Sequence, residues 1–213
     1  MALHTIVIGT SKSKNQNGYY IEAKDKFWGL LFKGGATPRL YEPSEFRLLS
    51  DLHGIGFSEL AFEQSHFGDN ESRAFSNDQQ LKNEIDVLTA GIPLLMNHLD
   101  KVKPKRIVFN GKTAASLFLQ FIDKKEILEV NAKHINQKGL NYGNIGVWNG
   151  IEMWMMPNMS GAAGKSWKDE QGELKWLSFW KLIAPECKAK KPAWIWISLF
   201  ILIIITTIIF LKK

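Results

Sequence analysis

Short apolar runs alternate along the chain with longer segments whose apolar residues recur at helical spacing. Four runs are rich in β-branched or aromatic residues and have polar or glycine neighbours, which is typical of buried strands. They cover residues 4–8, 55–62, 105–109 and 152–156. The helical segments cover residues 26–32, 43–51, 79–98, 110–122 and 167–183. Alternating strands and helices predict an α/β domain of three layers, α/β/α, around a mostly parallel four-stranded sheet.

A different pattern begins near the C-terminus. Residues 193–211 read AWIWISLFILIIITTIIFL and contain no charged residue. A helix needs about 20 apolar residues to cross a bilayer, and Trp194 and Trp196 are suited to the membrane interface. We therefore expect a transmembrane helix over 193–211, a basic linker over 185–192 and a folded domain over 1–184.

The first residues read as a strand and not as a signal peptide, so the sequence predicts a single-pass, tail-anchored protein whose soluble domain faces the cytoplasm. The net charge is +6, but five of the 27 Lys and Arg residues flank the apolar span and all 21 acidic residues precede it. The part before these flanks therefore carries only +1. Overall charge gives no support for a nucleic-acid partner, and the single Cys187 excludes an intrachain disulfide.

Several common catalytic motifs are absent. Lys112 follows a predicted strand within Gly-Lys-Thr, but a phosphate-binding P-loop requires another glycine six residues before the lysine, where Arg106 stands. At a helix start Lys112 could bind a phosphate, although a solvated lysine explains it equally well. The five histidines lack zinc-site spacing, and no Gly-x-Ser-x-Gly motif occurs. We expect no metal and no cofactor.

Two loops, 9–20 and 157–165, follow predicted strands and would meet at the carboxyl edge of a parallel sheet, where such folds bind ligands. Together with Phe27-Trp28 and residues 110–115, they resemble the mismatch-specific uracil-DNA and thymine-DNA glycosylase family. The matching stretches follow the family's order along nearly the whole domain. They are IVIGTSKSKNQNGYYIEAKDKFWGLLFKGGATPRLYEPSEF, HGIGFSELA, IVFNGKTAASLF and MWMMPNMSGAAGKSW.

This resemblance implies a cofactor-free DNA glycosylase that rotates a nucleotide out of the helix and hydrolyses the N-glycosidic bond of uracil or a related deaminated or modified base. Tyr20 matches the family's base-stacking aromatic, although a core tyrosine is the alternative. The other base-binding candidates are Gly9, Thr10, Ser58 and Asn158.

The resemblance also implies a DNA-binding surface around the second loop. Ala162 matches the residue that enters the vacated space in the helix, and so small a plug predicts weak duplex opening or a preference for single strands. The DNA-binding candidates are Lys12, Lys14, Lys112, Ser160, Gly161, Ala162 and Lys165. We expect DNA and a lipid bilayer as partners, and a monomeric protein.

The chain departs from the family at the catalytic position, where Ser11 stands in place of the asparagine of the best-known members. A serine hydroxyl can orient water, but it supplies no carboxylate to activate it. Activity would then depend on stabilising the departing base anion through loop N–H groups. A catalytically silent, membrane-anchored module that binds or senses nucleic acid, for instance phage DNA, is one alternative. A binder of nucleotide metabolites or RNA bases is another.

Overall fold

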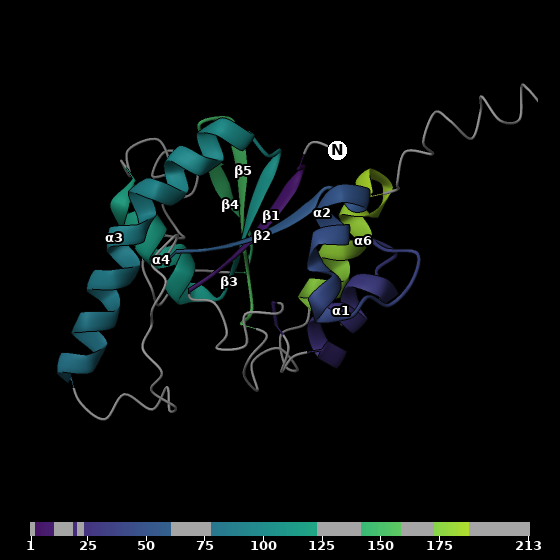
Figure 1. Ribbon diagram of the computed structural model, residues 1–213, viewed down its shortest axis with the longest axis horizontal. Helices are drawn as coiled ribbons and strands as arrows, with labels where there is room; N and C mark the ends of the chain where they lie inside the picture. The colour runs from purple at the N-terminus through teal and green to yellow at the C-terminus, as the bar shows by residue number, and fades with distance from the viewer. Residues whose placement is uncertain are drawn as a thin grey trace, which may run out of the picture.

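The chain forms an α/β domain in which helices cover both faces of a central sheet (Figure 1). The computed structural model describes residues 3–10, 19–20, 24–60, 78–122, 142–158 and 173–187. The α/β class and the mostly parallel sheet are confirmed. The sheet has five strands, however, so the prediction of four was wrong.

The strand order across the sheet is β2-β1-β3-β5-β4. The first four of these strands run parallel, and β4 is antiparallel to β5. The strands span Thr5–Gly9 (β1), Ile55–Glu59 (β2), Arg106–Asn110 (β3), Gly143–Trp148 (β4) and Ile151–Met156 (β5).

The strand that the sequence did not predict, β4, is the first arm of a hairpin with β5. Two glycines, Gly143 and Gly146, lower its strand propensity and hide it from a search for β-branched runs. The turn carries the signal that could have found it. Asn149 and Gly150 adopt φ angles of 47° and 78°, and Asn-Gly is the most typical sequence of a two-residue hairpin turn.

Helices α3 and α4 cover one face of the sheet, and α1, α2 and α6 cover the other (Figure 1). A 3-10 turn over Pro43–Glu45 leads into α2. The last helix begins later than the predicted 167 and continues into the predicted linker. The helices span Lys24–Lys33 (α1), Phe46–His53 (α2), Asp78–Val102 (α3), Lys112–Phe121 (α4) and Lys175–Cys187 (α6).

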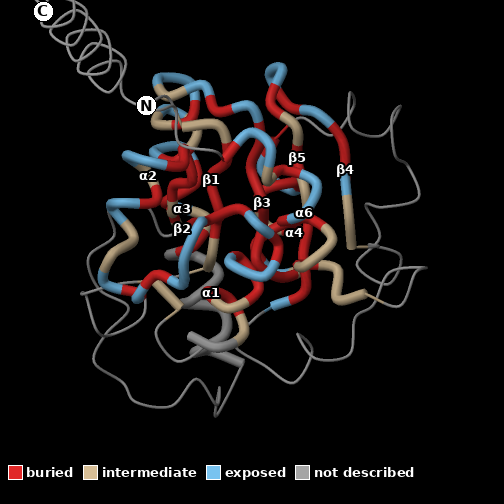
Figure 2. The backbone as a smooth tube through the Cα atoms, turned by 90° about the vertical axis from the view of Figure 1, so that its right-hand side faces the viewer, coloured by how far each residue is buried: buried red, intermediate tan, exposed pale blue. Residues whose placement is uncertain are grey.

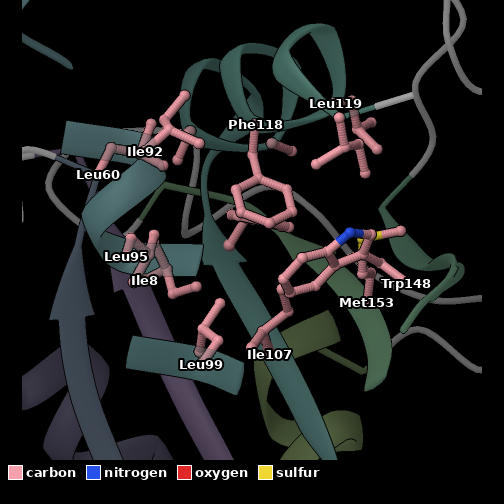
Figure 3. Close-up of a cluster of buried hydrophobic side chains, with 14 of the residues drawn as sticks. Ile8, Leu60, Ile92, Leu95, Leu99, Ile107, Phe118, Leu119, Trp148 and Met153 are labelled. Atoms are coloured by element: carbon pink, nitrogen blue, oxygen red, sulfur yellow. The ribbon is translucent and has the colours of Figure 1, made fainter. Parts of the chain in front are cut away.

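Each face of the sheet has its own hydrophobic core, and the strands between them are buried (Figure 2). On the α3 and α4 side, Phe118 packs between aliphatic residues of the strands and of α3 (Figure 3). On the other side the core is aromatic, and Phe27 lies edge-on to both Trp176 and Trp180. Successive residues of a strand point alternately into the two cores. The position of a polar residue along its strand therefore shows on which side of the sheet its side chain lies.

The C-terminal end of α6 is fixed at the amino edge of the sheet. Arg106, the first residue of β3, is 4% exposed, and its guanidinium binds both carboxylate oxygens of Glu186 at 2.9 and 3.0 Å. His53 donates from Nδ1 to the carbonyl of Cys187 at 2.9 Å and accepts from the hydroxyl of Tyr41 through Nε2. The chain therefore leaves the described domain at the edge opposite to the strand C-termini.

The ion pair between Arg106 and Glu186 makes the stability of the folded domain depend on pH. Hydrogen bonding to Arg106 lowers the pKa of Glu186 from 4.5 to about 2. A carboxyl whose folded pKa is depressed stabilises the folded state above its unfolded pKa, and this contribution is lost as the pH falls from about 4.5 towards 2. Urea unfolding at several pH values should show this loss, and Glu186→Gln should remove part of it. An unchanged acid dependence in Glu186→Gln would contradict the assignment.

None of the helices in the described ranges combines the length and the apolar character that crossing a bilayer requires. Residues 188–213, which include the predicted span and most of the predicted linker, lie outside those ranges. The membrane anchor therefore stays a prediction.

Candidate functional site

The two loops singled out in the sequence leave the sheet at the same edge. Because β1, β3 and β5 are parallel, their last residues all lie at its carboxyl edge. Thr10 follows β1 and Asn158 follows β5 by two residues, and only β3 separates these strands. Neighbouring strands are about 4.8 Å apart, so the starting points of the two loops lie roughly 10 Å apart.

A row of three residues crosses this edge on the side that faces α1. Glu59 pairs with Gly9, and Asn110 is next to Gly9 on the other side because the preceding residues, Ile8 and Phe109, are partners. The residues two positions earlier in each strand belong to the aromatic core. Alternation along a strand therefore places Glu59, Gly9 and Asn110 on that same side.

Tyr20 fills the space that Gly9 leaves in the middle of this row. A Cβ atom at Gly9 would lie 3.5 Å from the Tyr20 hydroxyl oxygen, and this hydroxyl is hydrogen-bonded to the side chain of Asn110. The Tyr20 ring stacks on Phe27 with 4.4 Å between centroids. Its backbone has a φ of 54°, a left-handed conformation that is uncommon for a bulky residue and is enriched at functional sites.

The environment keeps both tyrosines beside Glu59 protonated. Burial raises the pKa of Tyr20 above its usual value of 10, the bond with Asn110 acts in the opposite direction, and the charges of Tyr19 and Glu59 add to the increase. Burial and the negative charge of Glu59 raise the pKa of Tyr19 to about 12. At neutral pH both phenols at this edge are therefore uncharged.

Two more of the predicted site residues lie next to Gly111, the residue that follows β3. Gly111 has a φ of 108°, and a Cβ atom there would approach the Cβ of Asn158 to 3.2 Å, so glycine allows the exposed Asn158 to pack closely. Lys112 begins α4, and its ammonium lies 5.5 Å from the centroid of the Tyr142 ring. Asn158 and Lys112 thus flank Gly111, one residue beyond Asn110.

Ser58, although predicted to bind the base, lies on the other side of the sheet. It pairs with Ile8 of the aliphatic core, so its side chain faces α3 and α4 and not Tyr20. It is 5% exposed, and its hydroxyl has no hydrogen-bond partner among the described residues. The remaining predicted residues lie outside the described residues; they are Ser11, Lys12, Lys14, Ser160, Gly161, Ala162 and Lys165.

A cavity of about 280 Å³ lies between β5 and α6. Trp154, Phe179 and Lys175 contribute to its wall, and so does Met156, which pairs with Asn110 in the sheet. A flat ring fits aromatic walls of this kind, and the lysine adds a positive charge at the N-terminal end of α6.

The sequence did not single out Glu59 and Asn110 as site residues. Both stand in stretches that resemble the glycosylase family, but their position on either side of Gly9 depends on strand register. Alternation along the strands could have found them. Glu59 lies two residues after Phe57 and Asn110 two residues after Val108, and both of these earlier residues belong to the aromatic core. No group of three or more potential metal ligands occurs among the described residues.

Fold and site together define an α/β domain with a mostly parallel sheet and a polar row at its carboxyl edge. Comparison with models of known protein families gives no match for the chain. A search of curated proteins also finds none with significant similarity.

Proposed function

We propose that this protein is a DNA glycosylase that hydrolyses the N-glycosidic bond of uracil or a related deaminated or modified base without a cofactor. One observation carries the proposal: three residues chosen from the resemblance, Gly9, Tyr20 and Asn158, all lie at the carboxyl edge of a parallel sheet. Ligands of open α/β folds bind at this edge.

The chemistry of the row suits a flipped nucleotide. Tyr20 offers an aromatic ring supported from behind by Phe27, and base stacking on such a ring contributes roughly 1–3 kcal/mol. Its protonated hydroxyl and the Asn110 amide are fixed dipoles that can stabilise a departing base anion, which is the main means of catalysis left when Ser11 replaces asparagine. Glu59 adds the carboxylate that the Ser11 loop lacks.

We also propose that residues 193–211 anchor the protein in a membrane with its domain in the cytoplasm. The support from the fold is the direction in which the chain leaves the domain. Because Arg106 and His53 hold the end of α6 at the amino edge, a tether starting there leaves the carboxyl edge turned away from the bilayer. Extraction with alkaline carbonate tests the anchor, since a spanning protein stays in the membrane pellet and a peripheral one is released.

The excision claim is tested with the full chain in detergent micelles. Labelled oligonucleotides that each carry one uracil, hypoxanthine or modified base are incubated with the protein and then cleaved with alkali at abasic sites. Strand cleavage at the altered base is the expected result. Intact strands with every substrate would contradict excision, and oligonucleotide binding without cleavage would favour the silent binding module instead.

Tyr20→Phe should slow excision about 10-fold or more, because removing the hydroxyl frees the Asn110 side chain to move and misplaces the polar row. The measurement is the single-turnover rate of abasic-site formation. Tyr41→Phe is the matched control, since it also removes a buried tyrosine hydroxyl, in this case one bound to His53 at 2.9 Å at the opposite edge. Equal effects of the two substitutions would show that Tyr20 acts only through stability.

A further inference from the structure

We propose that the cavity between β5 and α6 binds a small aromatic carboxylate, whose ring lies against Trp154 and Phe179 and whose acid group is bound by Lys175. All three side chains line the cavity. The inference goes beyond the proposed function and stands without it, because none of the residues that carry the excision proposal contributes to these walls.

The cavity exists because α6 covers β5 and leaves the neighbouring strand β4 partly open. Val147 pairs with Glu152 in the hairpin, so the two side chains lie on the same side of the sheet, which is the side of Trp154 and α6. Val147 is nevertheless 47% exposed. Gly143 leaves further space, since a Cβ atom there would meet no atom within 4 Å.

The size of the cavity limits the ligand to a small molecule. Its volume is about 280 Å³, whereas pockets for drug-sized ligands have roughly 300–1,000 Å³. A single ring system with a short acidic side chain is therefore the kind of molecule that it suits.

The walls are apolar and largely aromatic. Met156 and Phe179 are buried, and the rings of Phe179 and Trp154 lie 5.3 Å apart between centroids at an angle of 57°. A flat ring makes the largest contact with such walls. It would also cover Leu182, which lines the cavity and is 60% exposed, and removing this apolar surface from water favours binding.

Lys175 determines the charge of the ligand. Its ammonium has three donors, and it donates to the backbone carbonyl of Tyr142 at 3.4 Å, at the long end of hydrogen-bond distances. No carboxylate in the described ranges forms an ion pair with Lys175, and the nearby Glu173 binds Lys181 instead. A carboxylate on the ligand would supply the missing charge and accept a charge-assisted hydrogen bond.

Isothermal titration calorimetry with the full chain in detergent micelles tests the site, with empty micelles as the blank. The probes are indoleacetate and its neutral amide, indoleacetamide, which share the ring and differ in charge. The acid should bind about 10-fold more tightly than the amide, because a hydrogen bond to a charged group contributes more than one between neutral groups. High salt should reduce this preference, since it screens the charges.

Lys175→Met should bring the two affinities close together, because it removes the charge and keeps the apolar stem. Lys101→Met is the matched control, since it removes a lysine from the exposed surface of α3, which covers the opposite face of the sheet. This control should keep the preference for the acid. An equal loss of the preference in both variants would show that only the overall charge matters and would overturn the proposal.

The unaltered protein alone can also overturn the proposal. It would do so by binding neither probe, or by binding the acid and the amide equally. These two outcomes do not depend on whether either variant folds.

Discussion

Replacing Gly34 with alanine is expected to lower the free energy of unfolding by about 3 kcal/mol, which is the upper range for overpacking in a core. A Cβ atom at Gly34 would lie 2.4 Å from the Cβ of Trp180 and 3.2 Å from the backbone nitrogen of Lys181. Neither atom is the end of a flexible side chain. The clash can be relieved only by moving α6 away from α1, which would open the aromatic core between them.

Gly29 provides a matched control in α1. A Cβ atom there would meet no atom within 4 Å, and alanine in a helix is favoured over glycine by about 1 kcal/mol. Gly29→Ala should therefore stabilise the domain while Gly34→Ala destabilises it. Urea unfolding of the full chain in detergent, followed by tryptophan fluorescence, measures both. A change of the same sign in the two variants would contradict the packing of α1 against α6.

Arg106→Met is expected to cost about 2–3 kcal/mol of unfolding free energy. Removing one partner of a buried ion pair costs about 3–5 kcal/mol, because it leaves an uncompensated charge. The cost here is smaller, since the side chains of Glu152 and Glu186 are 35% and 33% exposed and keep part of their hydration. The Arg106 side chain itself is almost fully buried. Methionine in its place would keep the apolar contacts of the arginine stem and would lose the bonds to both carboxylates.

Lys105 is the control for this second prediction. It binds the same carboxylate of Glu186 at 2.7 Å, but its side chain is 52% exposed. Exposed ion pairs contribute about 0–1 kcal/mol, so Lys105→Met should change the midpoint of urea unfolding little. If the two substitutions had equal effects, the end of α6 would not depend on the buried part of the network.

The two predictions concern α6 at different points along its length. Gly34 sets how closely α6 approaches α1, and Arg106 fixes where α6 ends relative to the sheet. Arg106 lies at the amino edge of the sheet, so Arg106→Met should leave the excision rate of the remaining folded protein unchanged. A changed excision rate in this variant would indicate that the amino edge also influences the site.

The sequence by itself determined most of the local structure among the described residues, with β4 as the exception. The apolar run predicted as a strand at 105–109 corresponds to β3, which is shifted by one residue. The segment predicted as a helix at 79–98 lies within α3, although it contains Pro93. Periodicity and the preferences of single residues act over a few neighbouring positions, so they can be read without knowing the fold. The same reasoning placed the ends of β1 and β5 at one edge, since parallel strands end together.

The tertiary structure alone decided which distant residues meet. Glu59 and Asn110 come together because the register of β1 with its two neighbours places Gly9 between them, and a shift of one residue would turn both side chains to the other face. Tyr20 reaches this row through a left-handed backbone conformation. Arg106 binds Glu186 across 80 residues of sequence. Such contacts depend on how whole elements pair and pack, and the pattern within each element does not contain that information.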